Sequence, residues 1–397
     1  MNQANLYAGL IGVLAVESQR RATPPGQVNA VARELWHKAA GTVAPPESKD
    51  AVPLVVLDAG GVDRLRTLVA EQCSAAAVET LFSDRRAASR ESPGHKVPAV
   101  QAKLFQELLA ETATKLSVLH DKPEETTEST VRALWQVAAG APMSAEQAAK
   151  TALPALDAAA VGRLRELLKE RLAGIPLAHL TGRQRFMGLE LMTSKAALVP
   201  RKETELLGHV ALAVLRQLAS GQESLRVIDV CTGAGNLALA LATHEPKALV
   251  YASDLSSEAV ELARRNGTLL GLGGRVEFRQ GDFLNPFADS SFNRNVDLLV
   301  CNPPYISSGK VGTLPTEIIG HEPSLAFDGG PFGVKILQRL LTEAPQFLRP
   351  DGWLAFEVGL GQGPALMDRM RRNPAYADLA AVVDAAGAVR AVVARLQ

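Results

Sequence analysis

The sequence is poor in cysteine, has no net charge and contains no long apolar run. Its three cysteines, Cys73, Cys231 and Cys301, lie far apart, so neither a disulfide framework nor a metal site is expected, and a reducing, cytoplasmic location is favoured. Its 42 basic and 42 acidic residues balance, which argues against a nucleic-acid partner held by overall charge. No segment reaches the roughly 18–20 apolar residues of a membrane span. Residues 1–21 lack a basic leader and predict an amphipathic helix instead of a signal peptide.

The first half of the chain contains an internal repeat. Residues 33–72 and 132–171 align without a gap at an offset of 99 residues, and 17 of the 40 aligned positions are identical. Low complexity explains some alanine matches but not the paired tryptophans Trp36 and Trp135, which we interpret as core anchors of two copies of one unit. Within each copy the apolar residues recur at helical spacing. The first half is therefore expected to be a duplicated all-α module.

The two copies are assigned to residues 1–90 and 100–182, joined through the polar stretch 89–98. Asp58 and Asp157 occupy equivalent positions in front of apolar, periodic segments. An aspartate at such a position caps a helix by accepting hydrogen bonds from its first free amides. Nothing in either copy indicates chemistry by itself, so reacting groups are expected in the second half.

From residue 183 the pattern changes. Residues 183–199 predict a β-hairpin, and residues 200–219 predict a helix with acidic residues in its first turn, which suits the helix dipole. Apolar strands then alternate with helices, and the strands are expected at 226–230, 250–254, 276–282, 296–301, 353–359, 379–384 and 388–395. Repeated βα units of this length predict a doubly wound, parallel sheet. The chain is thus expected to be α/β over 206–397, preceded by a hairpin linker over 183–205.

Three segments at the ends of successive strands predict a nucleotide-type site. DVCTGAGN (229–236) joins the first strand to a helix, and Gly233 and Gly235 allow a tight turn with close backbone approach. The segment lacks the Gly-Lys-Ser/Thr of a phosphate loop, which disfavours an NTPase. Asp254 ends the next strand, where a carboxylate accepts ribose hydroxyls, and residues 281–283 end the third. Together they favour an adenosine-containing cofactor.

The fourth strand, 296–301, stops abruptly at Asn302, Pro303, Pro304 and Tyr305. Prolines donate no ladder hydrogen bond, so the strand must end there, and their carbonyls stay free to accept. The Asn302 oxygen and a proline carbonyl can accept hydrogen bonds from a planar amine or amide and orient its nitrogen, while Tyr305 covers the planar group. This arrangement suits methyl transfer from S-adenosylmethionine to nitrogen by positioning, without a general base.

Residues 172–397 resemble the HemK/PrmC family of S-adenosylmethionine-dependent protein-glutamine N-methyltransferases. The resemblance is carried by GIPLAHLTG (174–182), LVPRKETELL (198–207), VIDVCTGAG (227–235), SDLS (253–256), GDF (281–283), NPPYI (302–306), LPTEIIGHEPSLAFDGG (314–330) and FEVGLGQG (356–363). It implies a Rossmann-like class I methyltransferase sheet of seven strands and a second helical module that recognises a protein substrate such as a peptide chain release factor.

The resemblance also implies roles for individual residues. The catalytic residues it implies are Asn302, Pro303, Pro304 and Tyr305. The cofactor contacts it implies are Asp229, Cys231, Thr232, Gly233, Ala234, Gly235, Asp254, Leu255, Asp282, Phe283 and Asn302. The substrate contacts it implies are Arg201, Glu203, Tyr305 and Glu322. No metal is implied, and the oligomeric state stays open.

Two departures from the family pattern keep alternatives open. The module over 1–99 is extra, and Lys202 replaces the proline expected between Arg201 and Glu203. Both are compatible with a small-molecule N- or O-methyltransferase of specialised metabolism. An adenine-specific nucleic-acid methyltransferase shares the Asn-Pro-Pro-Tyr loop, but the zero net charge and the lack of a basic, aromatic-interleaved segment oppose it. A non-catalytic scaffold is opposed by the intact cofactor loop.

Overall fold

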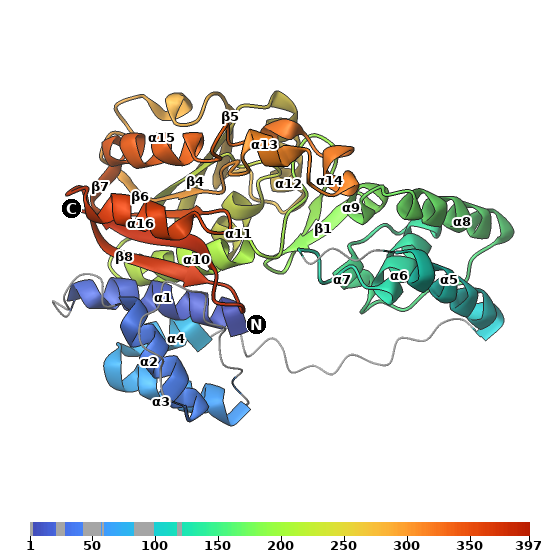
Figure 1. Ribbon diagram of the computed structural model, residues 1–397, viewed down its shortest axis with the longest axis horizontal. Helices are drawn as coiled ribbons and strands as arrows, with labels where there is room; N and C mark the ends of the chain where they lie inside the picture. The colour runs from blue at the N-terminus through green and yellow to red at the C-terminus, as the bar shows by residue number, and fades with distance from the viewer. Residues whose placement is uncertain (1–2, 21–27, 43–56, 58, 83–98, 117–120) are drawn as a thin grey trace.

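The structure is a computed structural model that describes residues 3–20, 28–42, 57, 59–82, 99–116 and 121–397. Within these ranges the chain forms a seven-stranded α/β domain with two helical modules attached (Figure 1). The first module, in blue, lies beneath the last strands of the sheet, and the second, in teal, extends from the other end of the domain (Figure 1). None of the described helices is long and apolar enough to cross a membrane.

The described residues of both modules form helices and no strand, as predicted, and corresponding contacts recur in each. The first contains α1 (Gln3–Arg20), α2 (Val28–Ala40), α3 (Ala59–Gln72) and α4 (Ala75–Phe82). The second contains η2 (Ala99–Gln101), α5 (Ala102–Lys115), α6 (Thr127–Ala138), α7 (Ala145–Ala148), α8 (Ala158–Leu172) and α9 (Leu177–Thr181). The side chain of Gln3 exchanges two hydrogen bonds with the backbone of Leu57, and Gln101 does the same with Leu156. Such recurrence is what a duplicated module predicts.

The paired tryptophans are core anchors, as interpreted. Trp36 is fully buried and meets Tyr7 edge-on at a centroid distance of 5.3 Å, and Trp135 is fully buried against Phe105 at 6.0 Å. Of the two predicted caps, Asp157 accepts a hydrogen bond of 2.7 Å from the Ala160 amide at the start of α8. Asp58 and the linker 89–98 lie outside the described residues.

The α/β domain follows a short hairpin of β1 (Arg183–Phe186) and β2 (Leu189–Met192), as predicted. Its strands are β3 (Leu225–Val230), β4 (Ala248–Asp254), β5 (Val276–Gln280), β6 (Val296–Cys301), β7 (Leu348–Glu357), β8 (Tyr376–Val383) and β9 (Val389–Leu396). Its helices are α10 (Glu205–Ala219), α11 (Asn236–His244), α12 (Ser257–Leu269), α13 (Ser308–Val311), α14 (Thr316–Ile319), α15 (Lys335–Glu343) and α16 (Gly363–Arg371), with the 3₁₀ turns η3 (Asn285–Phe287), η4 (Ser324–Ala326) and η5 (Ala344–Gln346). The strand order β5-β4-β3-β6-β7-β9-β8 confirms the seven-stranded Rossmann-like fold.

The parallel pairing predicted from the βα units is found for β3 to β7 but not for the last two strands. β3 to β7 pair in parallel, but β9 pairs antiparallel with both β7 and β8. The turn between β8 and β9 is closed by a hydrogen bond of 2.9 Å from the Asp384 amide to the Ala388 carbonyl. A turn this short cannot make a parallel crossover, which needs about a dozen residues or more. As a result β8 forms one edge of the sheet.

The helix predicted over 200–219 begins later, at Glu205. The preceding residues are held by the second module: Arg201 pairs with Asp121 at 3.1 Å, and Lys202 pairs with Glu146 of α7 at 2.8 Å. These long-range ion pairs fix a segment that local propensity assigned to the helix. Lys202, the residue that departs from the family pattern, therefore ties the second module to the α/β domain.

The helix α1 belongs to the core of the α/β domain. Leu10, Ile11 and Val13 are fully buried and share one apolar cluster with residues of α10 and β8. The crossing with α10 is tight at Gly12, where a Cβ atom would lie 2.7 Å from the Ala213 Cβ and 2.8 Å from a backbone carbonyl oxygen of α10. Burial of apolar area at this contact stabilises the position of the first module.

The first module also covers the edge of the sheet. The Asn29 side chain of α2 donates to the Ala381 carbonyl at 2.6 Å and accepts from the Ala381 amide at 2.9 Å. An uncovered edge strand presents unpaired backbone groups to other chains. Asn29 therefore satisfies two groups of β8 in the way that a neighbouring strand would.

Gly12→Ala is expected to destabilise the protein by about 1–3 kcal/mol, because its methyl group must displace backbone and a core side chain at the α1–α10 crossing. Chemical denaturation followed by circular dichroism measures the change. Gly162→Ala is the matched control, since Gly162 lies within α8 with no atom within 4 Å of its added Cβ. Equal unfolding midpoints for the two variants would contradict the tight crossing.

Candidate active site

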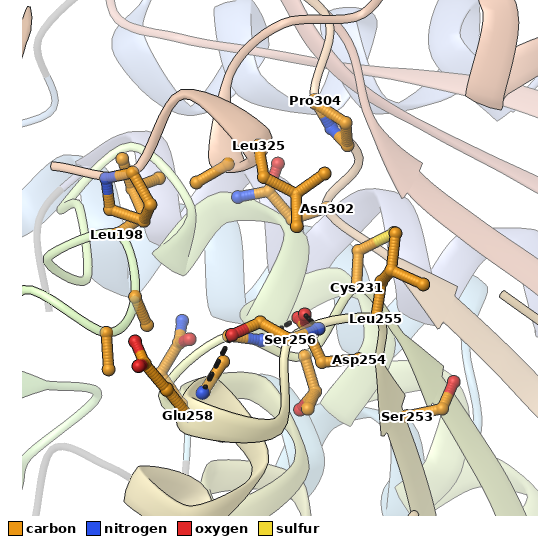
Figure 2. A pocket seen from close by; sticks show the side chains of 18 of the residues that line it. Leu198, Cys231, Ser253, Asp254, Leu255, Ser256, Glu258, Asn302, Pro304 and Leu325 are labelled. Atoms are coloured by element: carbon orange, nitrogen blue, oxygen red, sulfur yellow. Dashed lines mark hydrogen bonds between the residues drawn. The ribbon is translucent and has the colours of Figure 1, made fainter. Parts of the chain in front are cut away.

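A pocket lies at the carboxyl ends of β3, β4 and β6, where ligands bind in open α/β sheets. Its wall is built from the turn before α10, the loop between β3 and α11, the start of α12, and the segments that follow β5 and β6. Asn302 and Pro304 lie on one side of it, and Asp254, Ser256 and Glu258 on another (Figure 2). The strand-end segments singled out in the sequence thus meet around one space.

The structure brings most of the predicted site residues to this pocket. The predicted residues that line it are Arg201, Cys231, Thr232, Gly233, Asp254, Leu255, Asp282, Phe283, Asn302 and Pro304. The predicted residues that do not line it are Glu203, Asp229, Ala234, Gly235, Pro303, Tyr305 and Glu322. Several residues of the second set form hydrogen bonds or ion pairs that hold the loops and side chains of the pocket wall in place.

The loop after β3 makes a tight turn into α11. Cys231, Gly233 and Gly235 all have positive φ angles, of 59°, 54° and 80°. Gly235 lies against α12 and β5, and a Cβ there would lie 3.1 Å from the Phe278 ring. Gly235 therefore lets the helix approach the sheet, whereas Gly233 presents its backbone at the pocket.

Asp229 supports this loop from beneath. The carboxyl is fully buried and accepts hydrogen bonds from the Thr232 hydroxyl at 2.6 Å and the Ala238 amide at 3.2 Å. Burial raises the pKa of Asp229 to about 7, partly offset by these two hydrogen bonds. Asp229 therefore holds the loop and the first turn of α11 in place without facing the pocket.

Asp254 is anchored at the end of β4. One carboxylate oxygen accepts from the Gly233 amide at 2.9 Å, and the other accepts from the Ser256 amide at 3.0 Å. Burial raises the pKa of Asp254, while these backbone bonds favour its charged form. Since each carboxylate oxygen has two lone pairs, Asp254 retains acceptor capacity toward the pocket.

Asp282 and Phe283 close the pocket beyond β5. Phe283 is 5% exposed and has a φ of 57°, so its ring is held in one direction by a turn. Arg339 of α15 donates to Asp282 at 2.9 Å, and its guanidinium lies 4.9 Å from the centre of the Phe283 ring. The cation stabilises both side chains by an ion pair and a cation–π contact.

Asn302 presents its side chain at the pocket, and its amide donates to the Thr204 hydroxyl at 3.1 Å. Tyr305 turns inward: its hydroxyl donates to Glu357 at 2.8 Å and lies 3.4 Å from Glu203. Burial and the neighbouring carboxylates raise the pKa of Tyr305 well above its usual value. The hydroxyl stays protonated and keeps the loop after Asn302 in one position.

The two acids expected to touch substrate are engaged in ion pairs. Glu322 is 5% exposed, pairs with Arg201 and accepts from the Val199 amide at 3.0 Å. Glu203 pairs with Arg390 of β9. Arg201 itself lines the pocket, so Glu322 acts on the pocket by orienting Arg201.

Buried ion pairs join the second module to the segment that follows Tyr305. Glu317 of α14 accepts from Lys122 and from Arg171 of α8, the latter at 2.8 Å, and Arg171 also pairs with Glu125 at 2.9 Å. All four residues are less than 9% exposed. A buried charge is tolerated only when it is paired. The second module therefore fixes the wall of the pocket through this cluster.

Several pocket residues were not singled out from the sequence. They are Lys195, Leu198, Thr204, Ser253, Ser256, Glu258, Leu325 and Ile336. Leu198 and Thr204 lie within the LVPRKETELL segment, which was identified as a resembling motif but not read for pocket contacts. Ser253 and Ser256 lie within SDLS, and Leu325 lies within LPTEIIGHEPSLAFDGG, two further resembling motifs. Lys195, Glu258 and Ile336 lie outside all of these motifs, and only the tertiary fold brings them to the pocket.

Residues 222–376 match a family model described as a methyltransferase domain. Release factor glutamine methyltransferase from Moorella thermoacetica is 42% identical over 239 residues, covering 60% of this chain and 81% of that protein. The enzyme of the same name from Xylella fastidiosa strain 9a5c is 40% identical over 53% of this chain and 73% of its own length, and that from Synechocystis is 34% identical over 55% and 73%.

Proposed function

Because the chain belongs to the release factor glutamine methyltransferase family, we propose that it methylates the side-chain amide nitrogen of a glutamine in a peptide chain release factor. The chain is a methyltransferase, and its methyl donor is S-adenosylmethionine. The observation that supports the proposed acceptor is the position of Asn302, whose side chain faces the pocket beside Pro304.

The residues of the pocket suit S-adenosylmethionine. The ligand combines a ribose, a planar adenine and a charged amino-acid part. Asp254 offers carboxylate lone pairs for ribose hydroxyls, and Gly233 offers close backbone approach. Phe283 and Leu255 supply apolar surface for the adenine. We assign cofactor binding to this set.

When bound, S-adenosylmethionine supplies an electrophilic methyl group, and its transfer to an amide nitrogen leaves S-adenosylhomocysteine and releases one amide proton. The task of the chain is positioning. Asn302 accepts a hydrogen bond from the amide of the substrate and fixes the direction of its nitrogen. A proline carbonyl of this loop provides a further acceptor, because proline has no N–H group to use it in a ladder. The apolar side chain of Leu325 also lines the pocket.

The two helical modules are proposed to have different tasks. The second module, residues 100–182, is held to the pocket wall by the buried cluster around Glu317, and we assign substrate recognition to it. The first module, residues 1–90, contacts the sheet edge and α10. The linker 183–205 and the catalytic domain 206–397 complete this division.

The small-molecule alternative is not favoured. Two departures from the family pattern, the extra module over 1–99 and Lys202, had supported a small-molecule acceptor. Lys202 pairs with Glu146 and Glu205 and does not line the pocket, so its presence is explained by the contact between domains. The matched relatives carry the name of a release factor methyltransferase.

Incubation of the protein with S-adenosylmethionine and a GGQ-containing release factor tests the proposal. Peptide mass spectrometry is expected to find a gain of about 14 Da on the glutamine of that motif. A release factor in which this glutamine is replaced by alanine is the control and is expected to stay unmodified. No mass gain on the intact release factor, under conditions where the protein binds S-adenosylmethionine, would refute the proposed acceptor.

A further inference from the structure

A buried row of polar side chains runs behind the pocket from Asn302. The Asn302 amide nitrogen lies 3.1 Å from the Thr204 hydroxyl, and Thr204 is 1% exposed. The Thr204 hydroxyl in turn interacts with the carboxyl of Glu357, which is 2% exposed at the end of β7. β6 and β7 are adjacent and parallel, with Cys301 opposite Phe356. Asn302 and Glu357 directly follow this pair, so they lie side by side where the two neighbouring strands end.

The direction of each proton in this row follows from the chemistry of its members. A carboxylate only accepts hydrogen bonds, so a Thr204 hydroxyl directed at Glu357 gives its single proton to that carboxylate. Its oxygen is then an acceptor and takes an N–H of Asn302. The amide of Asn302 has two ends, and the nitrogen is turned to Thr204. Its oxygen is left for the pocket.

We propose that Thr204 and Glu357 are positioning residues that set the amide of Asn302 with its oxygen toward the methyl acceptor. This assignment rests on the proposed function, because an acceptor oxygen is needed only if the substrate presents an N–H group. Tyr305 completes the arrangement by donating to the other oxygen of Glu357 at 2.8 Å. Glu357 Oε2 is buried without a hydrogen-bond partner of good geometry among the described residues, and Thr204 is a hydroxyl next to this carboxyl that can supply one.

The charges around Glu357 come from every element packed against it. Glu203, in the turn before α10, disfavours the charged form of Glu357, whereas Arg390 of β9 favours that charged form. Tyr305 donates to it, and the Cys301 thiol of β6 is a further titratable neighbour. Burial is the largest influence and raises the pKa of Glu357 to about 7. The carboxyl thus changes its charge within the working range of most enzymes.

Protonation reverses the direction of the hydrogen bonds in this row. A neutral Glu357 donates to Thr204, Thr204 then donates to the Asn302 oxygen, and the Asn302 N–H group is turned to the pocket. A donor facing the N–H of the acceptor amide opposes binding in the reactive orientation. Since the neutral form prevails below its pKa, methyl transfer is expected to fall about tenfold per pH unit below about 7.

The first test compares the pH dependence of kcat for Glu357→Gln and wild type with a release factor substrate. Glu357→Gln does not ionise, so the acidic limb is expected to disappear, with kcat at pH 8 lowered about tenfold. Thr204→Val is expected to lose a similar factor, and Thr204→Ser, which keeps the hydroxyl, to restore it. Thr342→Val is the control for hydroxyl loss, since that hydroxyl bonds to Gln338 within α15.

The second test needs no acceptor. The side-chain amide signal of Asn302 in a ¹⁵N spectrum is identified by its loss in Asn302→Asp. It is expected to titrate near pH 7 in wild type and to stay constant in Glu357→Gln. A titration that persists in Glu357→Gln, or that is absent from wild type, would overturn the positioning assignment. If the titration is as expected but the release factor is not methylated, the proposed acceptor fails and the positioning assignment stands.

Discussion

Asn302→Ala is expected to lower kcat for glutamine methylation by about two to three orders of magnitude. The side chain supplies the acceptor that holds the substrate amide at the pocket, and loss of one well-placed polar group at a reacting centre costs a factor of this size. Single-turnover methyl transfer to a release factor, followed by mass spectrometry, measures the effect.

Two controls separate this effect from loss of cofactor binding or folding. Calorimetry with S-adenosylhomocysteine is expected to give an affinity close to that of wild type, because Asp254, Gly233 and Phe283 remain in the pocket. Asn295→Ala changes the same residue type just before β6, at the far end of the strand from Asn302. It is expected to keep wild-type kcat. An Asn302→Ala enzyme with wild-type kcat would exclude the positioning role.

Glu317→Ala is expected to destabilise the protein by about 3–5 kcal/mol, because it leaves Lys122 and Arg171 buried without their shared counter-ion. Burial opposes ionisation of Glu317, but the two cations outweigh it and lower its pKa. Because the pKa of Glu317 is lower in the folded protein than in the unfolded chain, its ionisation stabilises the fold at any pH above the unfolded-state pKa. This contribution is lost as the pH falls through the folded-state pKa. Urea denaturation at neutral and acidic pH measures both effects.

Glu166→Ala provides the comparison for Glu317. Glu166 pairs with Lys169 at 3.9 Å on the surface of α8, where both side chains are more than 70% exposed. An exposed pair contributes less than about 1 kcal/mol, so this variant is expected to unfold near the wild-type midpoint. Equal stabilities of the two variants would show that the buried cluster does not hold the second module to the pocket wall.

The α/β domain was predictable because its signals are local. Apolar runs such as 296–301 are buried on both faces, and the prolines after Asn302 dictate where the strand stops. Parallel strands end at one edge of a sheet, so residues at the strand ends were expected to meet. Asp254, Phe283 and Asn302 do meet there.

The inward direction of Tyr305 and the place of Thr204 could not be predicted in the same way. Tyr305 was expected to face an acceptor, but its hydroxyl is bonded to Glu357, 52 residues further along the chain. Thr204 is 98 residues before its partner Asn302. Contacts between residues so far apart in the sequence depend on strand order and on where α10 begins, and neither can be predicted from local composition. The late start of α10, set by ion pairs to the second module, is an example.

The pairing of Asn29 with Ala381 bridges 352 positions of the chain. A ribosome therefore makes the first module long before the strand that receives it, and the side of α1 that packs against β8 stays uncovered until that strand is complete. Contacts of this length close late and slow folding. A polypeptide interrupted before β8 therefore keeps the contact between α1 and α10 but lacks the strand that Asn29 covers.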